Sequence, residues 1–541
     1  MKIMLIFPPQ GQPFLPHPAT AILTAVLKRD GHDVIQRDYN IEAYESFLCP
    51  DSLAAAGISP ITAAQSQKAR QRIRQAGEFL EPDAYWQDIL TIENCLGAVS
   101  GRRWGLKHLR MPPYRENFSS DIILAARDEE RNFLIPFLRE KAEEIARIAP
   151  GMLGISISWP SQLIPAFTLA RLVKERMPSI HVCMGGSLVS RLSGQMAGCP
   201  GLFPFADTFV PFEGEAPLLA LCQGLQTGSL QEVPGIICRE RENIRQNPPP
   251  PPTPLASLPL PCYDGLPLSL YYSPGPYLPI SASRGCYWGR CTFCTHHGPG
   301  TPFRQRSPEA IAEEMETMEQ AHGCKNFYFV DDCLPPALAG KLAERLAGRG
   351  FRWGGEIRLE RGLDAPYFRT LHRGGCRLLL FGLESACLRI LELMNKGIDP
   401  GEAAGIIKAA DGEGIITWVF FFLGFPGERR HEARLTLKYL IENRDHIDVI
   451  AGGTFTLTRG STVERQPERF ALGGIGKEGM GDLQLSFPFT TREGLQAPEA
   501  ARLTEEFKRK DEARKFLLPF VAEPHVLFFR KSHFAVEGKR G

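Results

Sequence analysis

The sequence predicts an α/β protein made of two successive domains with parallel sheets, and three observations indicate this fold class. Apolar, strand-like runs alternate with helical patterns from residue 2 onward. A proline-rich stretch at residues 247–254 interrupts the alternation, and further strand and helix units follow it. Because parallel strands need crossover connections that are usually helices, the alternation favours parallel sheets on both sides of the prolines.

The first 227 residues are predicted to form a Rossmann-like domain with a helical insertion at about residues 41–150. An apolar run at residues 2–7, a helical pattern that ends at Gly31 and a second apolar run at residues 33–39 predict a parallel strand–helix–strand unit. Residues 41–150 are mostly helical in pattern. The alternation then resumes at residues 152–158, 165–175, 180–184 and 207–211.

Residues 228–275 are predicted to be a proline-rich linker, with residues 247–254 as an extended polyproline II spacer. A recognition motif for an SH3-like module is a less favoured interpretation of these prolines. Residues 276–460 are predicted to form a partial (β/α)6 barrel. Its strands are expected at residues 278–283, 326–330, 352–357, 377–381, 415–423 and 449–457. Residues 461–541 are predicted to be a small C-terminal appendage, with a strand-like segment at residues 524–529.

Composition and charge exclude several classes of protein. The 62 basic and 61 acidic side chains nearly cancel, which argues against a nucleic-acid scaffold, so nucleic acid is not an expected partner. The longest apolar run, residues 415–425, is shorter than the roughly 20 residues that a membrane-spanning helix needs. The first residues lack the pattern of a signal peptide, so a cytoplasmic location without membrane attachment is expected.

Three of the 14 cysteines, Cys286, Cys291 and Cys294, follow the first predicted barrel strand closely. The others are scattered and are expected to be buried core residues. Three thiolates could bind zinc, with His296 or His297 as a fourth ligand. They could equally hold an iron-sulfur cluster, with one iron left open for a non-protein ligand. The position after a barrel strand, at the face where barrel active sites lie, favours the cluster.

Further motifs lie at the ends of the predicted barrel strands. They are Ser283-Arg-Gly-Cys286, Tyr328-Phe-Val-Asp-Asp332, Phe381-Gly-Leu-Glu-Ser-Ala386 with Met394-Asn-Lys-Gly397, and Phe422-Leu-Gly-Phe-Pro-Gly-Glu428. Together with the cysteine loop, these motifs resemble the radical S-adenosylmethionine (SAM) enzymes, and specifically the cobalamin-binding branch of that family. The resemblance covers most of the chain.

The resemblance implies that Cys286, Cys291 and Cys294 bind a 4Fe-4S cluster whose unique iron chelates the amino and carboxylate groups of SAM. The residues expected beside the adenine, the methionine and the ribose of SAM are Phe293, Asp331, Asp332, Glu384 and Ser385. Phe293, the aromatic residue before the last cysteine, is the one expected beside the adenine. Strand-end carboxylates can instead cap helices, and this alternative stays open for the acidic residues.

One departure from the family concerns the spacing of the cysteines. The usual pattern is Cys-x3-Cys-x2-Cys, whereas four residues separate Cys286 from Cys291 here. Gly289 lies in this gap and can absorb the extra residue, because glycine tolerates backbone conformations that other residues avoid. We therefore expect a longer loop with unchanged chemistry.

The first domain resembles the Rossmann-like cobalamin domain of the same branch. The resemblance implies that the nucleotide tail of cobalamin enters beside the strand ends, where hydroxyl groups can form hydrogen bonds and glycines allow close backbone approach. The residues expected there are Ser156, Ser158, Gly185, Gly186 and Glu213. No Asp-x-His-x-x-Gly segment follows the first strand. A histidine ligand to cobalt is therefore not predicted, and His17 and His32 are expected to be ordinary surface residues.

These resemblances imply a cobalamin-dependent radical SAM enzyme that methylates an unactivated carbon of a natural-product or peptide-like substrate. An electron donor such as flavodoxin or ferredoxin is the implied protein partner. One alternative is cyclisation or rearrangement with the same cofactors and without methyl transfer. Another is a non-catalytic cobalamin or cluster carrier, in which the SAM motifs would be superfluous. An RNA-modifying methylthiotransferase is disfavoured, because Cys49 and Cys95 do not form the further cysteine set that such enzymes carry.

Overall fold

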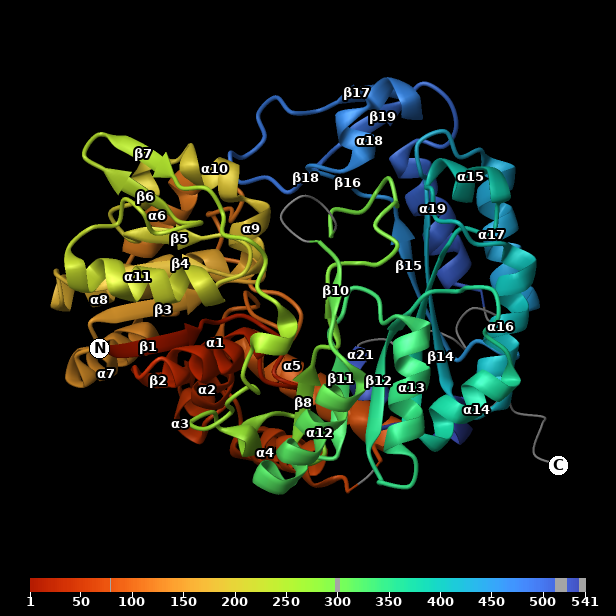
Figure 1. Ribbon diagram of the computed structural model, residues 1–541, viewed down its shortest axis with the longest axis horizontal. Helices are drawn as coiled ribbons and strands as arrows, with labels where there is room; N and C mark the ends of the chain where they lie inside the picture. The colour runs from red at the N-terminus through yellow and green to blue at the C-terminus, as the bar shows by residue number, and fades with distance from the viewer. Residues whose placement is uncertain (78, 297–301, 511–522, 535–541) are drawn as a thin grey trace. The chain divides into compact units, whose positions relative to one another are not determined.

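The computed structural model describes residues 1–77, 79–296, 302–510 and 523–534 (Figure 1). The chain divides into two compact units. The first comprises residues 1–77, 83–275 and 480–485, and the second comprises residues 78–82, 276–479 and 486–541. Within the described residues, no helix is both long and apolar enough to cross a membrane.

The first unit is built on a seven-stranded sheet with the order β2-β1-β3-β4-β5-β6-β7. The parallel strands are β1 (Lys2–Phe7), β2 (Asp33–Asp38), β3 (Met152–Ser156), β4 (His181–Gly185) and β5 (Thr208–Val210). The crossover helices include α1 (Pro18–Arg29) and α8 (Leu163–Arg176), and α11 (Glu215–Thr227) follows β5. This arrangement confirms the predicted Rossmann-like fold.

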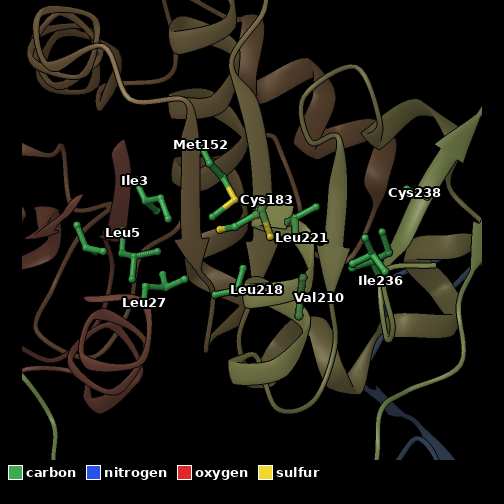
Figure 2. Close-up of a cluster of buried hydrophobic side chains, with 13 residues drawn as sticks. Ile3, Leu5, Leu27, Met152, Cys183, Val210, Leu218, Leu221, Ile236 and Cys238 are labelled. Atoms are coloured by element: carbon green, nitrogen blue, oxygen red, sulfur yellow. The ribbon is translucent and has the colours of Figure 1, made fainter. Parts of the chain in front are cut away.

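The core of the first unit lies between the sheet and the helices α1 and α11 (Figure 2). Ile3 and Leu5 of β1 are buried with Leu27 of α1 and with Leu218 and Leu221 of α11. Burial of a side chain of this size contributes roughly 1.5–3 kcal/mol to folding. This packing holds the sheet, and with it the loops at the ends of its strands.

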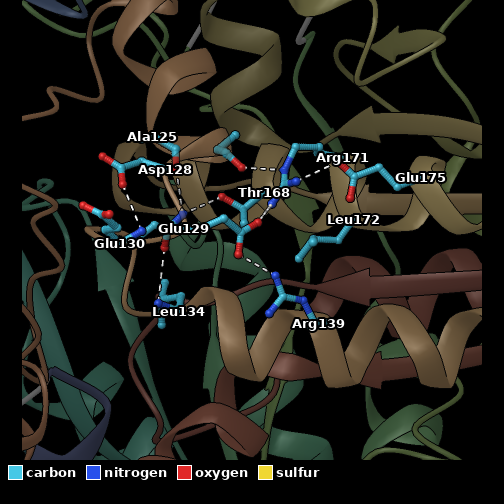
Figure 3. A network of polar contacts seen from close by, with 12 residues as sticks. Ala125, Asp128, Glu129, Glu130, Leu134, Arg139, Thr168, Arg171, Leu172 and Glu175 are labelled. Carbon is cyan, nitrogen blue, oxygen red and sulfur yellow. Dashed lines mark hydrogen bonds and ion pairs between the residues drawn. The ribbon is translucent and has the colours of Figure 1, made fainter.

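Six helices lie between β2 and β3, where the sequence predicts a helical insertion. They are α2 (Tyr39–Phe47), α3 (Pro50–Ala55), α4 (Pro60–Gln75), α5 (Pro82–Val99), α6 (Ser119–Arg127) and α7 (Ile135–Ile148). A polar network ties α6 and α7 to α8 (Figure 3). Arg171 of α8 donates to Glu129 over 2.8 Å and to the carbonyl oxygen of Ala126 over 2.7 Å. Because Arg139 of α7 also bonds to Glu129, the Glu129 carboxylate links α7 to α8.

Residues 228–275, predicted to be a linker, contain two strands of the first sheet. Strands β6 (Ile237–Glu240) and β7 (Asn243–Gln246) form a hairpin that extends the sheet in the antiparallel direction. Further along, the hydroxyl group of Tyr271 donates to Asp38 over 2.5 Å. The linker prediction is therefore corrected for this hairpin, whose short and mostly polar strands give a weak sequence signal next to the prolines.

The second unit contains a six-stranded parallel sheet in the order β15-β14-β13-β12-β11-β8. Its strands are β8 (Tyr277–Ile280), β11 (Asn326–Phe329), β12 (Arg352–Ile357), β13 (Cys376–Glu384), β14 (Ile416–Leu423) and β15 (Val449–Thr454). The helices between them include α12 (Pro308–His322), α13 (Pro336–Leu346), α14 (Ala365–Arg373), α15 (Leu388–Leu393), α16 (Pro400–Gly412) and α17 (Arg430–Glu442). Sequential parallel strands with helical crossovers confirm the predicted partial barrel.

The C-terminal segment corrects one expectation, because residues 524–529 do not form a strand. Residues Glu523–Val526 form α21, and the apolar residues that follow are buried. Phe528 packs on Tyr277 at the start of β8, with ring centroids 5.1 Å apart, and Lys531 donates to the carbonyl oxygen of Ile415 over 2.9 Å. A short apolar run cannot be assigned to strand or helix by periodicity alone. The segment covers the amino-terminal ends of the barrel strands, opposite the candidate site.

Candidate functional site

The cysteine loop leaves β8 through the short strand β9 (Ser283–Arg284), which pairs with β10 (Arg304–Gln305). Cys286, Cys291 and Cys294 are all partly exposed on this loop. Gly289, in the lengthened gap, has a φ angle of +57°, a conformation that favours glycine. The backbone at Gly289 thus uses the conformational freedom by which this glycine is expected to absorb the extra residue.

The loop is fastened across the carboxyl ends of the barrel strands. The backbone N–H of Thr292 donates to the carbonyl oxygen of Met394 over 2.9 Å, and its hydroxyl group donates to that of Leu393 over 3.0 Å. The ring of Phe293 lies edge-on to Phe422 near the end of β14, with centroids 5.3 Å apart. The three cysteines therefore lie at the edge where barrel active sites are built.

The three thiols differ in acidity. A hydrogen bond from the Cys333 thiol, helped by the backbone N–H groups of Gly289 and Trp288, lowers the pKa of Cys286 to about 5 against the opposing effect of burial. Burial raises the pKa of Cys291 and raises that of Cys294 to about 11. Cys286 is therefore a thiolate at neutral pH, whereas the other two lose their protons when metal binds. The sequence offered no signal that Cys333 lies beside Cys286.

The arrangement of the thiols suits a cluster better than a single zinc ion. The negative charge of Cys286 raises the pKa of Cys291 and of Cys294, and that of Cys291 raises the pKa of Cys294. Yet no three His, Cys, Asp or Glu side chains in the described parts of the chain surround one metal position. Zinc needs ligands converging on one point at about 2.0–2.3 Å, whereas the cysteines of a 4Fe-4S cluster bind different irons. His296 is held by Asp332, with 2.6 Å between Nδ1 and Oδ1, and His297 lies outside the described residues.

Two of the residues expected to face SAM, Asp331 and Ser385, form hydrogen bonds within the second unit. Asp331 is buried, and its carboxylate accepts hydrogen bonds from the backbone N–H of Ala282 at 3.0 Å and from the hydroxyl group of Ser283 at 2.5 Å. Burial raises the pKa of Asp331 to about 6. Ser385 is fully buried, and its hydroxyl oxygen accepts a hydrogen bond from the N–H of Cys387 at 3.1 Å. We therefore assign these two side chains to holding the strand ends.

Glu384 lies at the end of β13 with a φ angle of +64° and pairs with Lys396 over 2.9 Å. Each of these two side chains is 12% exposed. The ammonium group of Lys396 lies 6.0 Å from the centroid of the Phe293 ring, and its charge favours the thiolate form of Cys291. Lys396 lies in the motif at residues 394–397, whose sequence alone does not indicate a role for the lysine. The geometry brings Glu384, Lys396 and Phe293 together beside the cysteine loop.

Buried Glu428, the last residue of the motif after β14, is a titrating group in the scaffold. Loss of hydration raises its pKa from an ordinary value of 4.5 to about 7. One of its oxygens accepts the N–H of Gly424 at 2.5 Å, and the other has no hydrogen-bonding partner among the described residues. The folded protein thus holds a proton that the unfolded chain releases above pH 4.5.

The wild type should become less stable as the pH rises, and we expect Glu428→Gln to abolish this pH dependence. Since the folded pKa is the higher one, wild-type stability falls as pH rises from 4.5 through about 7, by up to about 3 kcal/mol in total. Urea denaturation at about pH 5 and pH 8 should show this fall in the wild type and a flatter profile in the variant. Equal pH profiles of stability in the wild type and in Glu428→Gln would contradict this prediction.

Glu432→Gln is the matched control for this prediction. Burial opposes ionisation of Glu432, but hydrogen bonds from Arg389, one of them 2.6 Å long, lower its pKa to about 2. Because this folded pKa is depressed, its contribution to stability is present at neutral pH and is lost in acid. Glu432→Gln should therefore destabilise the protein at both pH values.

The residues expected at the cobalamin site lie at or beside the carboxyl ends of β3, β4 and β5. The hydroxyl oxygen of Ser156 is buried and has no hydrogen-bonding partner among the described residues. Gly186 has a φ angle of +105°, and a Cβ atom added to it would lie 2.4 Å from the carbonyl oxygen of Ile157. Glu213 accepts a hydrogen bond from the N–H of Thr253 at 3.3 Å. Gly186 and Glu213 therefore have structural roles within the unit, whatever they do toward a ligand.

His17 is not the ordinary surface residue that the sequence suggests. Its ring stacks on Phe7, with centroids 4.6 Å apart, and burial lowers its pKa to about 4. Its Nδ1 accepts the N–H of Ala19 at 3.4 Å, so the proton of the neutral ring sits on Nε2, which lies 2.9 Å from the hydroxyl oxygen of Ser158. His17 thus belongs to the strand-end edge, in a tautomer whose Nε2 carries a hydrogen.

Two exposed aromatic residues at the same edge escaped the sequence reasoning. Trp159, which follows Ser158, is 43% exposed, and Phe212, beyond β5, is 40% exposed. Phe212 also has a φ angle of +64°. Large apolar side chains left in solvent beside a strand end are typical of ligand-binding surfaces.

Residues 280–440 match the model of the radical SAM superfamily. An uncharacterized methyltransferase of Pyrococcus horikoshii is 30% identical over 55% of this chain and 65% of its own length. The bacteriochlorophyllide d C-12(1)-methyltransferase of Chlorobaculum tepidum is 30% identical over 32% of this chain and 39% of its own length. The anaerobic magnesium-protoporphyrin IX monomethyl ester cyclase of Synechocystis is 24% identical over 52% of this chain and 58% of its own length. The chain thus spans less than two thirds of these relatives.

Two solved structures share the whole fold. The cobalamin-dependent SAM radical enzyme OxsB, with aqua-cobalamin and SAM bound, matches with a TM-score of 0.64 and 14% identity over 93% of this chain and 66% of its own. The radical SAM methyltransferase TsrM from Kitasatospora setae, with cobalamin and a 4Fe-4S cluster bound, matches with a TM-score of 0.57 and 15% identity over 94% of this chain and 86% of its own. Residues 280–440 of the chain thus resemble the radical SAM superfamily. The chain's fold is that of the cobalamin-dependent enzymes within it.

Proposed function

We propose that this chain is a cobalamin-dependent radical SAM enzyme that transfers a methyl group to an unactivated carbon. The observation that carries the proposal is the loop of three cysteines at the carboxyl ends of the barrel strands, beside Phe293 and the Glu384–Lys396 pair. A 4Fe-4S cluster would supply the electron that cleaves SAM to a 5′-deoxyadenosyl radical, and cobalamin would carry the methyl group. The substrate is a small molecule or a peptide, and flavodoxin or ferredoxin is the proposed electron donor.

The residues of the second unit would hold SAM and orient it. Cys286, Cys291 and Cys294 would bind the cluster. The carboxylate of Glu384 and the exposed carboxylate of Asp332 can accept hydrogen bonds from the amino and hydroxyl groups of SAM. The ammonium group of Lys396 holds the carboxylate of Glu384 in place through their 2.9 Å ion pair.

The strand-end edge of the first unit is the proposed cobalamin site. Ser156 supports it, because a buried hydroxyl group without a partner is costly unless a ligand satisfies it. Ser158 and Gly185 line the same edge, and Trp159 and Phe212 offer apolar surface for a large ring system. Gly186 and Glu213 shape this edge through their own contacts.

Radical cyclisation or rearrangement without methyl transfer is the second candidate function. The similarity to the Synechocystis cyclase supports keeping it. It would use the same cluster, SAM and cobalamin residues, so the cofactor sites do not separate it from methyl transfer. A carrier without catalysis stays disfavoured, since it would leave the SAM-binding residues without a role.

Anaerobic turnover with methyl-labelled SAM, a strong reductant and a cell extract tests the proposal. We expect a product that has gained the labelled methyl group. A product without label, formed together with 5′-deoxyadenosine, would transfer the assignment to the second candidate. The absence of 5′-deoxyadenosine with a fully loaded protein would contradict both.

A further inference from the structure

Trp288 lies in the lengthened gap between Cys286 and Cys291 and is fastened to the turn that follows α15. Its indole Nε1 donates to the carbonyl oxygen of Asn395 over 2.9 Å. The ring also lies against Gly397, because a Cβ atom added to that glycine would lie 2.4 Å from the indole. One side chain of the cysteine loop is thus locked to the turn that carries Lys396.

Arg358 contacts both the Trp288 ring and the turn that follows α15. It is 5% exposed, and its guanidinium carbon lies 3.8 Å from the centroid of the Trp288 ring. It also donates to the carbonyl oxygens of Lys396 over 2.5 Å and Gly397 over 3.0 Å. Arginine over the face of an indole is the most favourable cation–π pair in proteins. Arg358 therefore holds the indole and the turn together.

Tyr287, the neighbour of Trp288, is held by the same network. Its hydroxyl group donates to Glu360 over 2.7 Å, and Glu360 pairs with Arg358 over 3.0 Å. Two successive residues of the loop are thus fixed directly after Cys286. A cavity of about 440 Å³ adjoins the network and is lined by Trp288, Arg358 and Glu360. Removing the indole would open this cavity toward the loop.

We propose that Trp288 is a positioning residue that clamps the lengthened loop so that Cys286 and Cys291 are held ready for the cluster. An extra residue gives a loop more freedom, and ordering it costs roughly 1–2 kcal/mol of backbone entropy. The hydrogen bond to Asn395 and the contact with Arg358 are contributions that can offset such a cost. The inference rests on the proposed function, since it assumes that the loop binds a cluster.

The test compares Trp288→Ala and Trp288→Phe with the wild type after anaerobic reconstitution. We expect an iron chelator to remove iron from Trp288→Ala about ten times faster, because the hydrogen bond and the cation–π contact are both lost. Trp288→Phe keeps a ring for Arg358 and should lie between the two. The electron paramagnetic resonance (EPR) spectrum of the reduced cluster should also change in Trp288→Ala.

Trp353→Phe is the matched control. Its indole also donates to a carbonyl oxygen, that of Gly374 at 2.9 Å, but it lies in the core of the second unit, on β12. This variant should lower the melting temperature and leave the iron-loss rate and the EPR spectrum unchanged. If Trp288→Ala lost iron at the wild-type rate, or lost iron only when the protein unfolded, the proposal that Trp288 clamps the loop would be wrong. If the wild type assembled no cluster, the proposed function itself would fail.

Discussion

Replacing Cys286, Cys291 and Cys294 together with alanine should reduce the cluster content of the protein from about four irons and four sulfides per chain to near zero. The physical reason is that thiolates are the ligands that retain iron in such clusters, and these three lie on one loop at the strand ends. Iron and acid-labile sulfide assays after anaerobic reconstitution measure the effect.

Cys333→Ala is the informative control, because Cys333 is the nearest cysteine outside the loop. Its thiol donates a hydrogen bond to Cys286 and is itself buried, with a pKa held well above its ordinary value first by that hydrogen bond and then by burial. A protonated thiol is a poor iron ligand. Cys333→Ala should therefore keep its iron and sulfide. Tightly bound zinc without sulfide in the wild type would show that the cluster assignment is wrong.

The sequence predicted the two sheets well because both obey a simple physical rule. Parallel strands buried on both faces read as apolar runs, and helices must join them. The runs at residues 2–7 and 415–423 correspond to β1 (Lys2–Phe7) and β14 (Ile416–Leu423). The hairpin of β6 and β7 escaped because its strands are short and carry charged residues such as Arg239 and Arg245, and an edge hairpin need not be apolar.

The site was harder to predict because a motif fixes residue types but not the direction of side chains. Asp331 and Asp332 are neighbours on the chain, yet Asp331 is buried against the backbone of residues 282–283 and Asp332 is exposed. Both residues lie beyond the end of β11 at Phe329, so the loop backbone sets the direction of each side chain. His17 escaped for a different reason, since its environment comes from Phe7 and Ser158, which are distant from it in sequence.

The two units can be separated by their reaction products. With a strong reductant, the protein should cleave SAM to 5′-deoxyadenosine even without its substrate, and Cys294→Ala should remove this product. Methyl transfer through cobalamin should also form S-adenosylhomocysteine, and only with cobalamin bound. Substituting Gly186 is a poor way to disable the cobalamin site, because a Cβ atom there would lie 2.4 Å from the backbone of Ile157 and would distort the sheet.

Trp159→Asp combined with Phe212→Asp is the better variant, because the two side chains are 43% and 40% exposed and the ring of Trp159 lies edge-on to Phe7 and His17 at the same strand-end edge. Loss of two aromatic contacts with a large ring system costs about 1.4 kcal/mol or more, which is at least about a tenfold weaker affinity for cobalamin. We expect S-adenosylhomocysteine to fall by a similar factor under subsaturating cobalamin, while 5′-deoxyadenosine is unchanged. Liquid chromatography with mass detection measures both products in one sample.

Ile61→Asp, on α4 of the same unit, supplies the control for charge and exposure, because Ile61 is 74% exposed and lies away from the strand ends. It should leave both products at wild-type levels. If the double variant and Ile61→Asp bound cobalamin equally well, the aromatic pair would have no part in the site. If the double variant lost both products together, the two reactions would not be divided between the units.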